Sequence, residues 1–86
     1  MREYPPTKKG LKQFLKELKP GKTYYQVWEN GGREYLRTFE FRRTRFGYWK
    51  DVDSGLDPDG VLGRYGSLYT DPPKLNASRE KARAAA

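Results

Sequence analysis

The chain has 86 residues, of which 34% are charged and 35% hydrophobic, and its formal net charge at pH 7 is +7. It contains no cysteine and no histidine, which excludes disulfides, thiolate metal sites, thiol nucleophiles and histidine-based acid–base catalysis. No apolar run approaches the ~20 residues of a membrane span, and the first ten residues lack the apolar segment of a secretory signal. We therefore expect a single small cytoplasmic domain with no cofactor, no membrane contact and no small-molecule substrate.

The N-terminal third predicts an extended leader followed by one amphipathic helix. Residues 1–6 are expected to be extended because the Pro5-Pro6 pair cannot enter a helix interior. Thr7 can cap a helix over residues 8–19, which Pro20-Gly21 would end. Because glycine is unfavourable inside a helix, the helix could instead begin at Gly10. Spacings of three and four place the apolar residues in one stripe, with lysines turned outward: Leu11, Phe14, Leu15 and Leu18.

From Thr23 onward the apolar period changes to two, which predicts strands. Residues 23–29 and 34–42 would pair through a tight turn at Asn30-Gly31-Gly32. A third strand over residues 45–52 would follow a bulge, because Arg-Arg-Thr is a poor turn sequence. Residues 51–60 are expected to be a loop, followed by short strands at 61–62 and 65–70 and by a short helix that Asn76 or Ser78 would cap.

Together these elements predict an α+β domain over residues 7–79 and a fraying tail over residues 80–86. The N-terminal helix would pack on a curled antiparallel sheet of four or five short strands, as in SH3-like or OB-like small barrels. Alternation along the strands assigns one set of side chains to the core: Tyr25, Val27, Tyr35, Phe39, Phe41, Phe46, Tyr48 and Val52.

The opposite face of the sheet would combine the rings of Tyr24, Trp28 and Trp49 with Arg42 and Arg45, and Arg43 and Lys50 would lie near its rim. Aromatic rings stack on bases and arginine binds phosphate, so this combination is typical of nucleic-acid binding. The alternative is that both tryptophans belong to the core and that arginine packs on them through cation–π contacts.

Two basic clusters extend this prediction. Arg42, Arg43 and Arg45 lie within four residues and could grip phosphates, or could simply form a solvated turn. Lys12 and Lys16 lie on the lysine face of the first helix and are further candidates for ligand contacts, although lysine is also common on any exposed helix face.

Four aspartates fall within residues 51–63, which contain no lysine or arginine and are called the acidic segment below. The spacing does not match a calcium-binding loop, because Leu56 and Leu62 occupy the positions that need glycine and glutamate. Turn chemistry explains the Asp-Pro-Asp-Gly run without a metal. Catalysis is not expected; the one route left open is a small histidine-free RNase built from Arg45, Arg64, Tyr65 and Tyr69.

The leading functional prediction is a small basic module that binds nucleic acid. The alternative is a regulator or inhibitor of the phage or mobile-element type, which would bind a host protein or nucleoprotein complex such as polymerase or nuclease machinery. The acidic segment bears on this choice: beside the basic patch it would repel nucleic acid and favour a mixed-charge protein partner. The sequence leaves DNA against RNA, and single strand against duplex, open.

Overall fold

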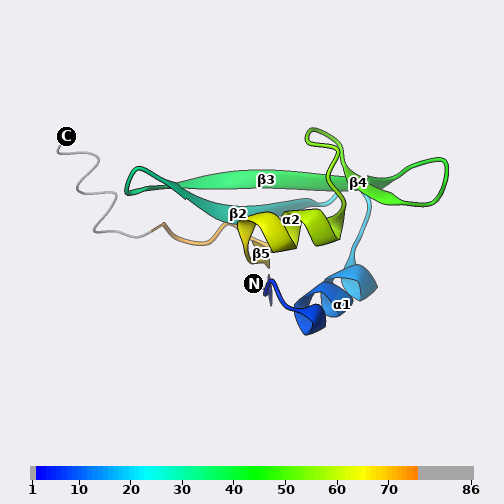
Figure 1. The fold of residues 1–86 in the computed structure, drawn as a ribbon, viewed down its shortest axis with the longest axis horizontal. Helices are drawn as coiled ribbons and strands as arrows, with labels where there is room; N and C mark the ends of the chain where they lie inside the picture. The colour runs from blue at the N-terminus through cyan, green and yellow to red at the C-terminus, as the bar shows by residue number, and fades with distance from the viewer. Residues whose placement is uncertain (1, 76–86) are drawn as a thin grey trace.

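The computed structural model describes residues 2–75, which form two helices and an open five-stranded antiparallel sheet (Figure 1). The strands and helices are β1 (Glu3–Tyr4), α1 (Lys8–Glu17), β2 (Thr23–Asn30), β3 (Arg33–Arg43), β4 (Trp49–Asp51), α2 (Pro58–Tyr65) and β5 (Leu68–Tyr69). The strands are arranged in the order β1-β5-β2-β3-β4, and both helices cover the same face of the sheet. The α+β class and the antiparallel sheet are therefore as predicted.

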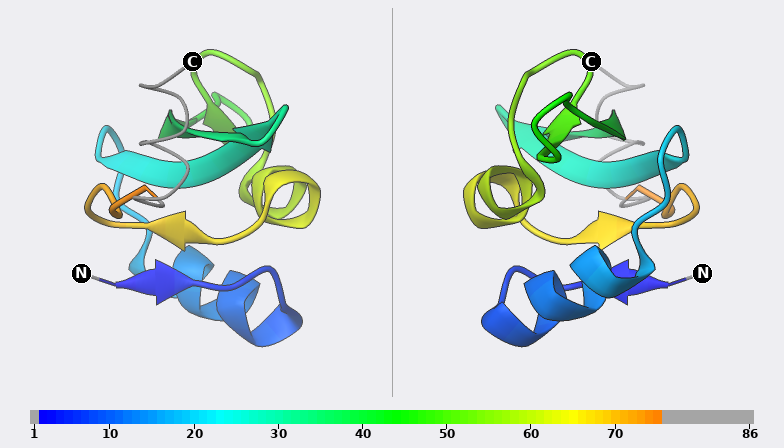
Figure 2. Two further views of the ribbon diagram at one scale, coloured as in Figure 1. Left: turned by 90° about the vertical axis from the view of Figure 1, so that its left-hand side faces the viewer. Right: turned by 90° about the vertical axis from the view of Figure 1, so that its right-hand side faces the viewer.

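The sheet curls around the core but does not close. Figure 2 shows β5 and β1 continuing below β2, so that this side of the sheet wraps toward the helices. Within residues 2–75, β1 and β4 remain the two edges, and a closed barrel is not formed. The expected short helix after Asn76 or Ser78 and the tail at residues 80–86 lie outside the described residues.

Helix α1 begins as predicted and ends two residues earlier than expected. The Thr7 hydroxyl accepts a hydrogen bond from the Gly10 backbone N–H at 3.0 Å, which makes Thr7 the N-cap. Gly10 lies inside the helix rather than at its start. The backbone of Pro5 passes directly over it, so a Cβ at this position would overlap the Pro5 carbonyl oxygen. Phe14 is fully buried, whereas Leu15 remains 44% exposed.

The residues expected to form a leader contribute to the folded unit. Glu3 and Tyr4 pair with β5, and Tyr4 lies in the core. The Tyr4 hydroxyl donates to Glu17 Oε1 at 2.7 Å. Burial, together with this neighbouring carboxylate, raises the pKa of Tyr4 to about 12. Hydrogen bonds from Tyr4 and Gln13 lower the pKa of Glu17.

The two hairpins differ in how far the sequence predicted them. The β2–β3 turn is as expected, with positive φ at Gly31 and Gly32, as a two-residue type I′ turn requires. The strand expected over residues 45–52 begins only at Trp49. Thr44 N–H donates to the Tyr48 carbonyl at 2.7 Å and Gly47 takes a positive φ, so residues 44–48 form a tight turn instead of a bulged strand.

Helix α2 replaces the strand that was expected at residues 61–62. Asp57 caps the helix by accepting from the Gly60 N–H at 2.7 Å, and Pro58 occupies its first turn, where a missing N–H costs nothing. Val61 and Leu62 are buried in the core from this helix. Only Leu68–Tyr69 of the last predicted strand is extended.

The core is aromatic and centred on Phe14. Its ring centroid lies 5.0 Å from those of Tyr4 and Tyr24 and 5.6 Å from that of Phe41. Phe39 and Phe41 of β3 point inward as predicted, but β2 is reversed: Tyr24 is buried, while its neighbour Tyr25 is only partly covered. Strand β2 therefore turns its even-numbered side chains toward the helices.

Candidate functional site

The aromatic outer face predicted from alternation is not assembled. Tyr24 is only 1% exposed, and its hydroxyl accepts from the Lys19 N–H at 3.1 Å, so its ring is not available to a ligand. Trp28 is half-buried on the helix side of the sheet. There the Arg37 guanidinium carbon lies 4.5 Å from the Trp28 ring centroid and 4.7 Å from that of Tyr65. This arginine is stacked between two rings of the protein itself.

The other predicted residues of the sheet do come together, in the β3–β4 hairpin. We call residues 42–50 the basic hairpin, because they include four basic residues and no acidic one. Arg43 pairs across the strands with Trp49, and its guanidinium carbon lies 4.6 Å from that ring. Arg42 pairs with Lys50 on the opposite side of the hairpin. Arg42 also forms an exposed ion pair with Glu40 at 2.8 Å.

The tip of the basic hairpin presents rings to solvent. Phe46 is 73% exposed and Tyr48 is 68% exposed, although the alternation pattern assigned both to the core. The Arg45 guanidinium carbon lies 5.0 Å from the Phe46 ring centroid. The Thr44 hydroxyl accepts from the N–H groups of Phe46 and Tyr48, which fixes the turn. A threonine followed three residues later by glycine was the sequence signal for this turn.

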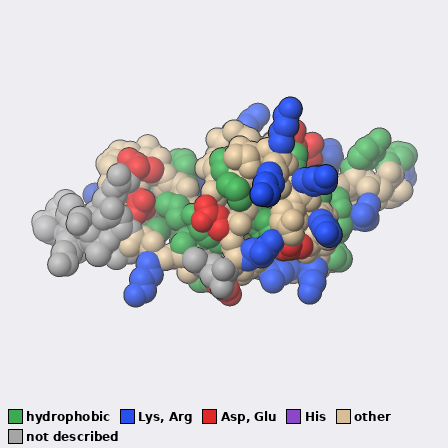
Figure 3. Space-filling view, turned by 90° about the horizontal axis from the view of Figure 1, so that it is seen from below, with side chains coloured by type: hydrophobic (Ala, Val, Ile, Leu, Met, Phe, Trp, Pro, Cys, Tyr) green, Lys and Arg blue, Asp and Glu red, His purple; other side chains and the backbone are tan. Residues whose placement is uncertain are grey.

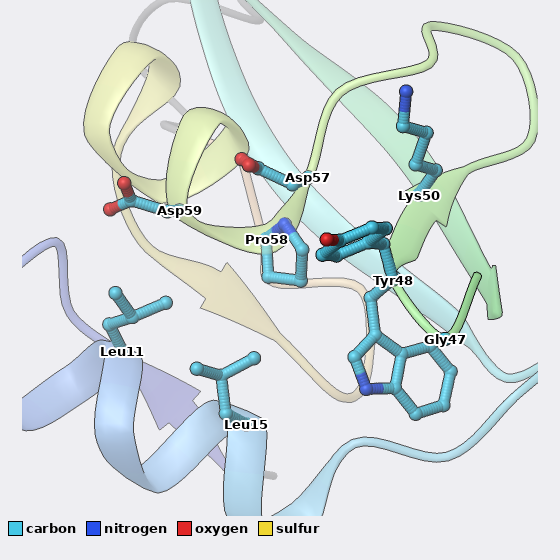
Figure 4. A pocket seen from close by; sticks show the side chains of 9 residues that line it. Leu11, Leu15, Gly47, Tyr48, Lys50, Asp57, Pro58 and Asp59 are labelled. Atoms are coloured by element: carbon cyan, nitrogen blue, oxygen red, sulfur yellow. The ribbon is translucent and has the colours of Figure 1, made fainter. Parts of the chain in front are cut away.

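A groove of about 310 Å³ lies between the basic hairpin, α1 and the start of α2. Leu11 and Leu15 of α1 form one wall, and Pro58 lies opposite them with Tyr48 beside it (Figure 4). Its full lining is Leu11, Leu15, Gly47, Tyr48, Trp49, Lys50, Asp57, Pro58 and Asp59. The lining is therefore mainly apolar, and its two acidic side chains, Asp57 and Asp59, both come from the start of α2.

The lysines of α1 extend the positive surface next to this groove. Lys12 and Lys16 are exposed on α1, the helix that also carries Leu11 and Leu15. Figure 3 shows lysine and arginine side chains gathered on the helix side, toward the end of the molecule where the basic hairpin lies. Lys16 also borders a second hollow at the end of α1, which is lined by Arg2, Tyr4, Lys16, Glu17, Leu18, Lys19, Lys22, Tyr24 and Thr70.

The four aspartates of the acidic segment have different roles. Asp51 is buried, and its carboxylate accepts from the N–H groups of Glu40 and Ser54 and from the Ser54 hydroxyl. Asp53, Asp57 and Asp59 are exposed, and Asp57 caps α2. Within residues 2–75, no three carboxylates are arranged to hold a metal ion.

The residues considered for an RNase are dispersed. Arg45 belongs to the tip of the basic hairpin, whereas the Tyr65 ring stacks on Phe39 in the middle of β3, with centroids 6.2 Å apart. Tyr69 pairs with Tyr25 in the sheet, and Arg64 lies in α2. These four side chains therefore do not gather at one point.

Comparison of the chain with protein-family models, with curated proteins and with solved structures finds no match. Neither helix of the described part of the chain is long and apolar enough to cross a membrane.

Proposed function

We propose that the protein is a small nucleic-acid-binding module that uses the basic hairpin, with α1 lysines as auxiliary phosphate contacts. The observation that carries this proposal is the tip of the hairpin, where two exposed rings stand among arginines without a neighbouring acid in the same nine residues. We propose binding rather than catalysis, because the hairpin combines cations and stacking surfaces but no acid–base pair.

The chemistry of the tip suits a polyanion that carries aromatic bases. Arg45 covers one side of the Phe46 ring. A base stacked on such a ring contributes ~1–3 kcal/mol to binding and needs no particular sequence. Arg43 lies over Trp49 and donates to the Gly47 carbonyl at 2.8 Å, so its charge is held in place at the base of the tip. Preorganised cations lose less conformational entropy when they bind phosphate.

A second candidate function is a regulator that binds a host protein or nucleoprotein complex. One observation favours it: Asp57 and Asp59 line the groove beside the basic hairpin, which gives this surface both signs of charge. Exposed Tyr, Trp and Arg side chains are also the types that dominate protein–protein hot spots. The experiment below separates the two candidates.

The test is fluorescence anisotropy with labelled single-stranded and duplex DNA and RNA at about 50 and 200 mM salt. We expect micromolar or tighter binding that weakens steeply with salt, because phosphate contacts release counterions. Phe46→Ala removes an exposed ring and should weaken binding about 5–150-fold without unfolding the protein. The Arg43→Ala/Arg45→Ala double variant should also make the salt dependence shallower, by a slope of about two.

The matched control is Arg33→Ala/Arg64→Ala, which removes the same charge from exposed positions outside the basic hairpin. If this control weakens binding as much as the hairpin variants do, net charge and not the hairpin is responsible. If no nucleic acid binds at low salt, the module proposal is wrong. The protein-binding candidate then becomes the one to pursue.

A further inference from the structure

We propose that the groove receives one unpaired base of a single-stranded nucleic acid and prefers guanine. This inference rests on the proposed function and specifies the ligand of the same site. In this inference an aspartate of the groove takes part in binding, although its negative charge by itself would repel a polyanion.

The walls of the groove suit the faces of a flat aromatic ring. Leu11 and Leu15 project from α1, and Pro58 and the Tyr48 ring lie across from them (Figure 4). Leu15 is an exposed apolar side chain on an otherwise lysine-rich helix surface, so covering it removes apolar area from water. The volume of about 310 Å³ is at the lower end of the ~300–1,000 Å³ found for small-ligand sites.

The charged groups in and beside the groove are separated by sign. Lys50 lines the groove and rises from β4, away from Leu11 and Leu15 in Figure 4. Lys12 and Lys16 are exposed on α1 but are not part of the groove lining. The carboxylates of Asp57 and Asp59 lie at the start of α2. A strand whose phosphates follow the lysines could therefore turn one base toward α2 without bringing its backbone against the carboxylates.

Carboxylates can only accept hydrogen bonds, and this determines which base they favour. Asp57 is engaged in capping α2, where its Oδ1 accepts from the Gly60 N–H, so the two oxygens of the exposed Asp59 carboxylate are the acceptors for the base. Guanine presents two adjacent donors, N1–H and N2–H, on its Watson–Crick edge. Thymine and uracil present one N–H flanked by two carbonyl oxygens, which the carboxylates would repel.

The ligand has to be single-stranded for this arrangement to work. In a duplex the Watson–Crick edge is paired and the base faces are stacked, so neither the carboxylates nor the groove walls could reach them. The exposed rings of Phe46 and Tyr48 likewise need unstacked neighbouring bases.

The test compares strands of about ten thymidines with and without a single central guanosine, using the full chain and anisotropy. We expect the guanosine strand to bind about ten-fold tighter, a typical effect of one specific base contact. Asp59→Asn should abolish the preference, because an amide places a donor where the carboxylate accepts, and should leave thymidine binding unchanged or slightly stronger. Asp53→Asn is the matched control: it removes the same charge from an exposed residue that does not line the groove, and should keep the preference.

Each result separates this inference from the proposed function. Equal binding of the two strands, or a preference that survives Asp59→Asn, overturns the guanine assignment while the nucleic-acid module stands. If neither strand binds at low salt, the guanine assignment fails, and the module proposal fails with it only when the single-stranded and duplex DNA and RNA of the first test do not bind either. Loss of the preference in Asp53→Asn as well would show that the charge of the segment, not the groove, is responsible.

Discussion

Replacing Gly10 by alanine tests how closely the chain segment between β1 and α1 packs on the helix. In an exposed helix interior this change stabilises a protein by ~1 kcal/mol, because glycine is a poor helix former. At Gly10, however, a Cβ would overlap the carbonyl oxygen of Pro5 and lie 2.8 Å from its carbonyl carbon. That oxygen also accepts from the Thr7 N–H at 2.8 Å, so Pro5 cannot move away freely.

The overlap is with backbone, which cannot rotate away as a side chain could. Overpacking of this kind costs ~1–3 kcal/mol, and here the upper end applies. After the gain in helix propensity is subtracted, we expect Gly10→Ala to lower the free energy of unfolding by about 1–2 kcal/mol. With a urea m-value of ~1 kcal/mol/M for a chain of this size, the midpoint should fall by roughly 1–2 M.

The control is Gly63→Ala in α2, where a Cβ would meet nothing within 4 Å. This exposed helical position should gain about 0.5–1 kcal/mol, so the two alanine variants should differ in sign. Urea unfolding followed by tryptophan fluorescence measures both. If Gly10→Ala proves as stable as the wild type, the crossing of Pro5 over α1 is wrong, and with it the placement of β1.

Two further predictions concern buried polar groups. Asp51→Ala removes the acceptor of the N–H groups of Glu40 and Ser54. Because these donors are left unsatisfied, the free energy of unfolding should fall by about 2–3 kcal/mol, measured by urea titration. An unchanged urea midpoint would contradict this prediction. The raised pKa of Tyr4, about 12, means that the folded state binds its proton more tightly than the unfolded state, whose value is near 10. Stability from this group is therefore complete below pH ~10 and lost toward pH 12, so the wild type should weaken by roughly 2–3 kcal/mol relative to Tyr4→Phe over that window. Parallel pH profiles for the two proteins would refute the assignment.

Local signals that were unambiguous in the sequence predicted the corresponding elements correctly. The Thr7 cap and the spacing from Leu11 to Leu18 predicted α1, since both depend on contacts within one or two turns. The Asn30-Gly31-Gly32 turn predicted the β2–β3 hairpin for the same reason. These elements fix the order helix, strand, strand, from which the α+β class follows.

The region after Trp49 was harder to predict because its signals conflict. Val61 and Leu62 favour a strand by composition, while Asp57 and Pro58 form a cap and a first turn. In the fold the cap prevails, because a helix buries Val61 and Leu62 against the core at the same time. Tertiary burial of this kind is not visible in a window of eight residues.

The candidate site shows what strand alternation can and cannot decide. In β2 both Tyr24 and Tyr25 could face the core, and alternation alone does not say which does. Phe14 settles the matter in the structure, because its ring packs edge-on against Tyr24 with centroids 5.0 Å apart. A shift of one residue reverses every side chain of a strand. The predicted outer face is therefore not assembled, whereas Arg42, Arg43 and Arg45 lie in one hairpin whichever way β2 faces.

The acidic segment illustrates why charge counted along a sequence differs from charge presented to a partner. Asp51 is enclosed by three hydrogen bonds and Asp57 holds the first turn of α2, so neither is a freely placed surface charge. Asp57 is exposed but bound to the Gly60 N–H, and of the other two exposed aspartates, Asp53 and Asp59, only Asp59 lines the groove. Long-range repulsion of a polyanion would depend on Asp53 and Asp59 about equally, whereas the proposed recognition of a base would depend on Asp59. The contrast between Asp53→Asn and Asp59→Asn therefore distinguishes a general electrostatic effect from a built site.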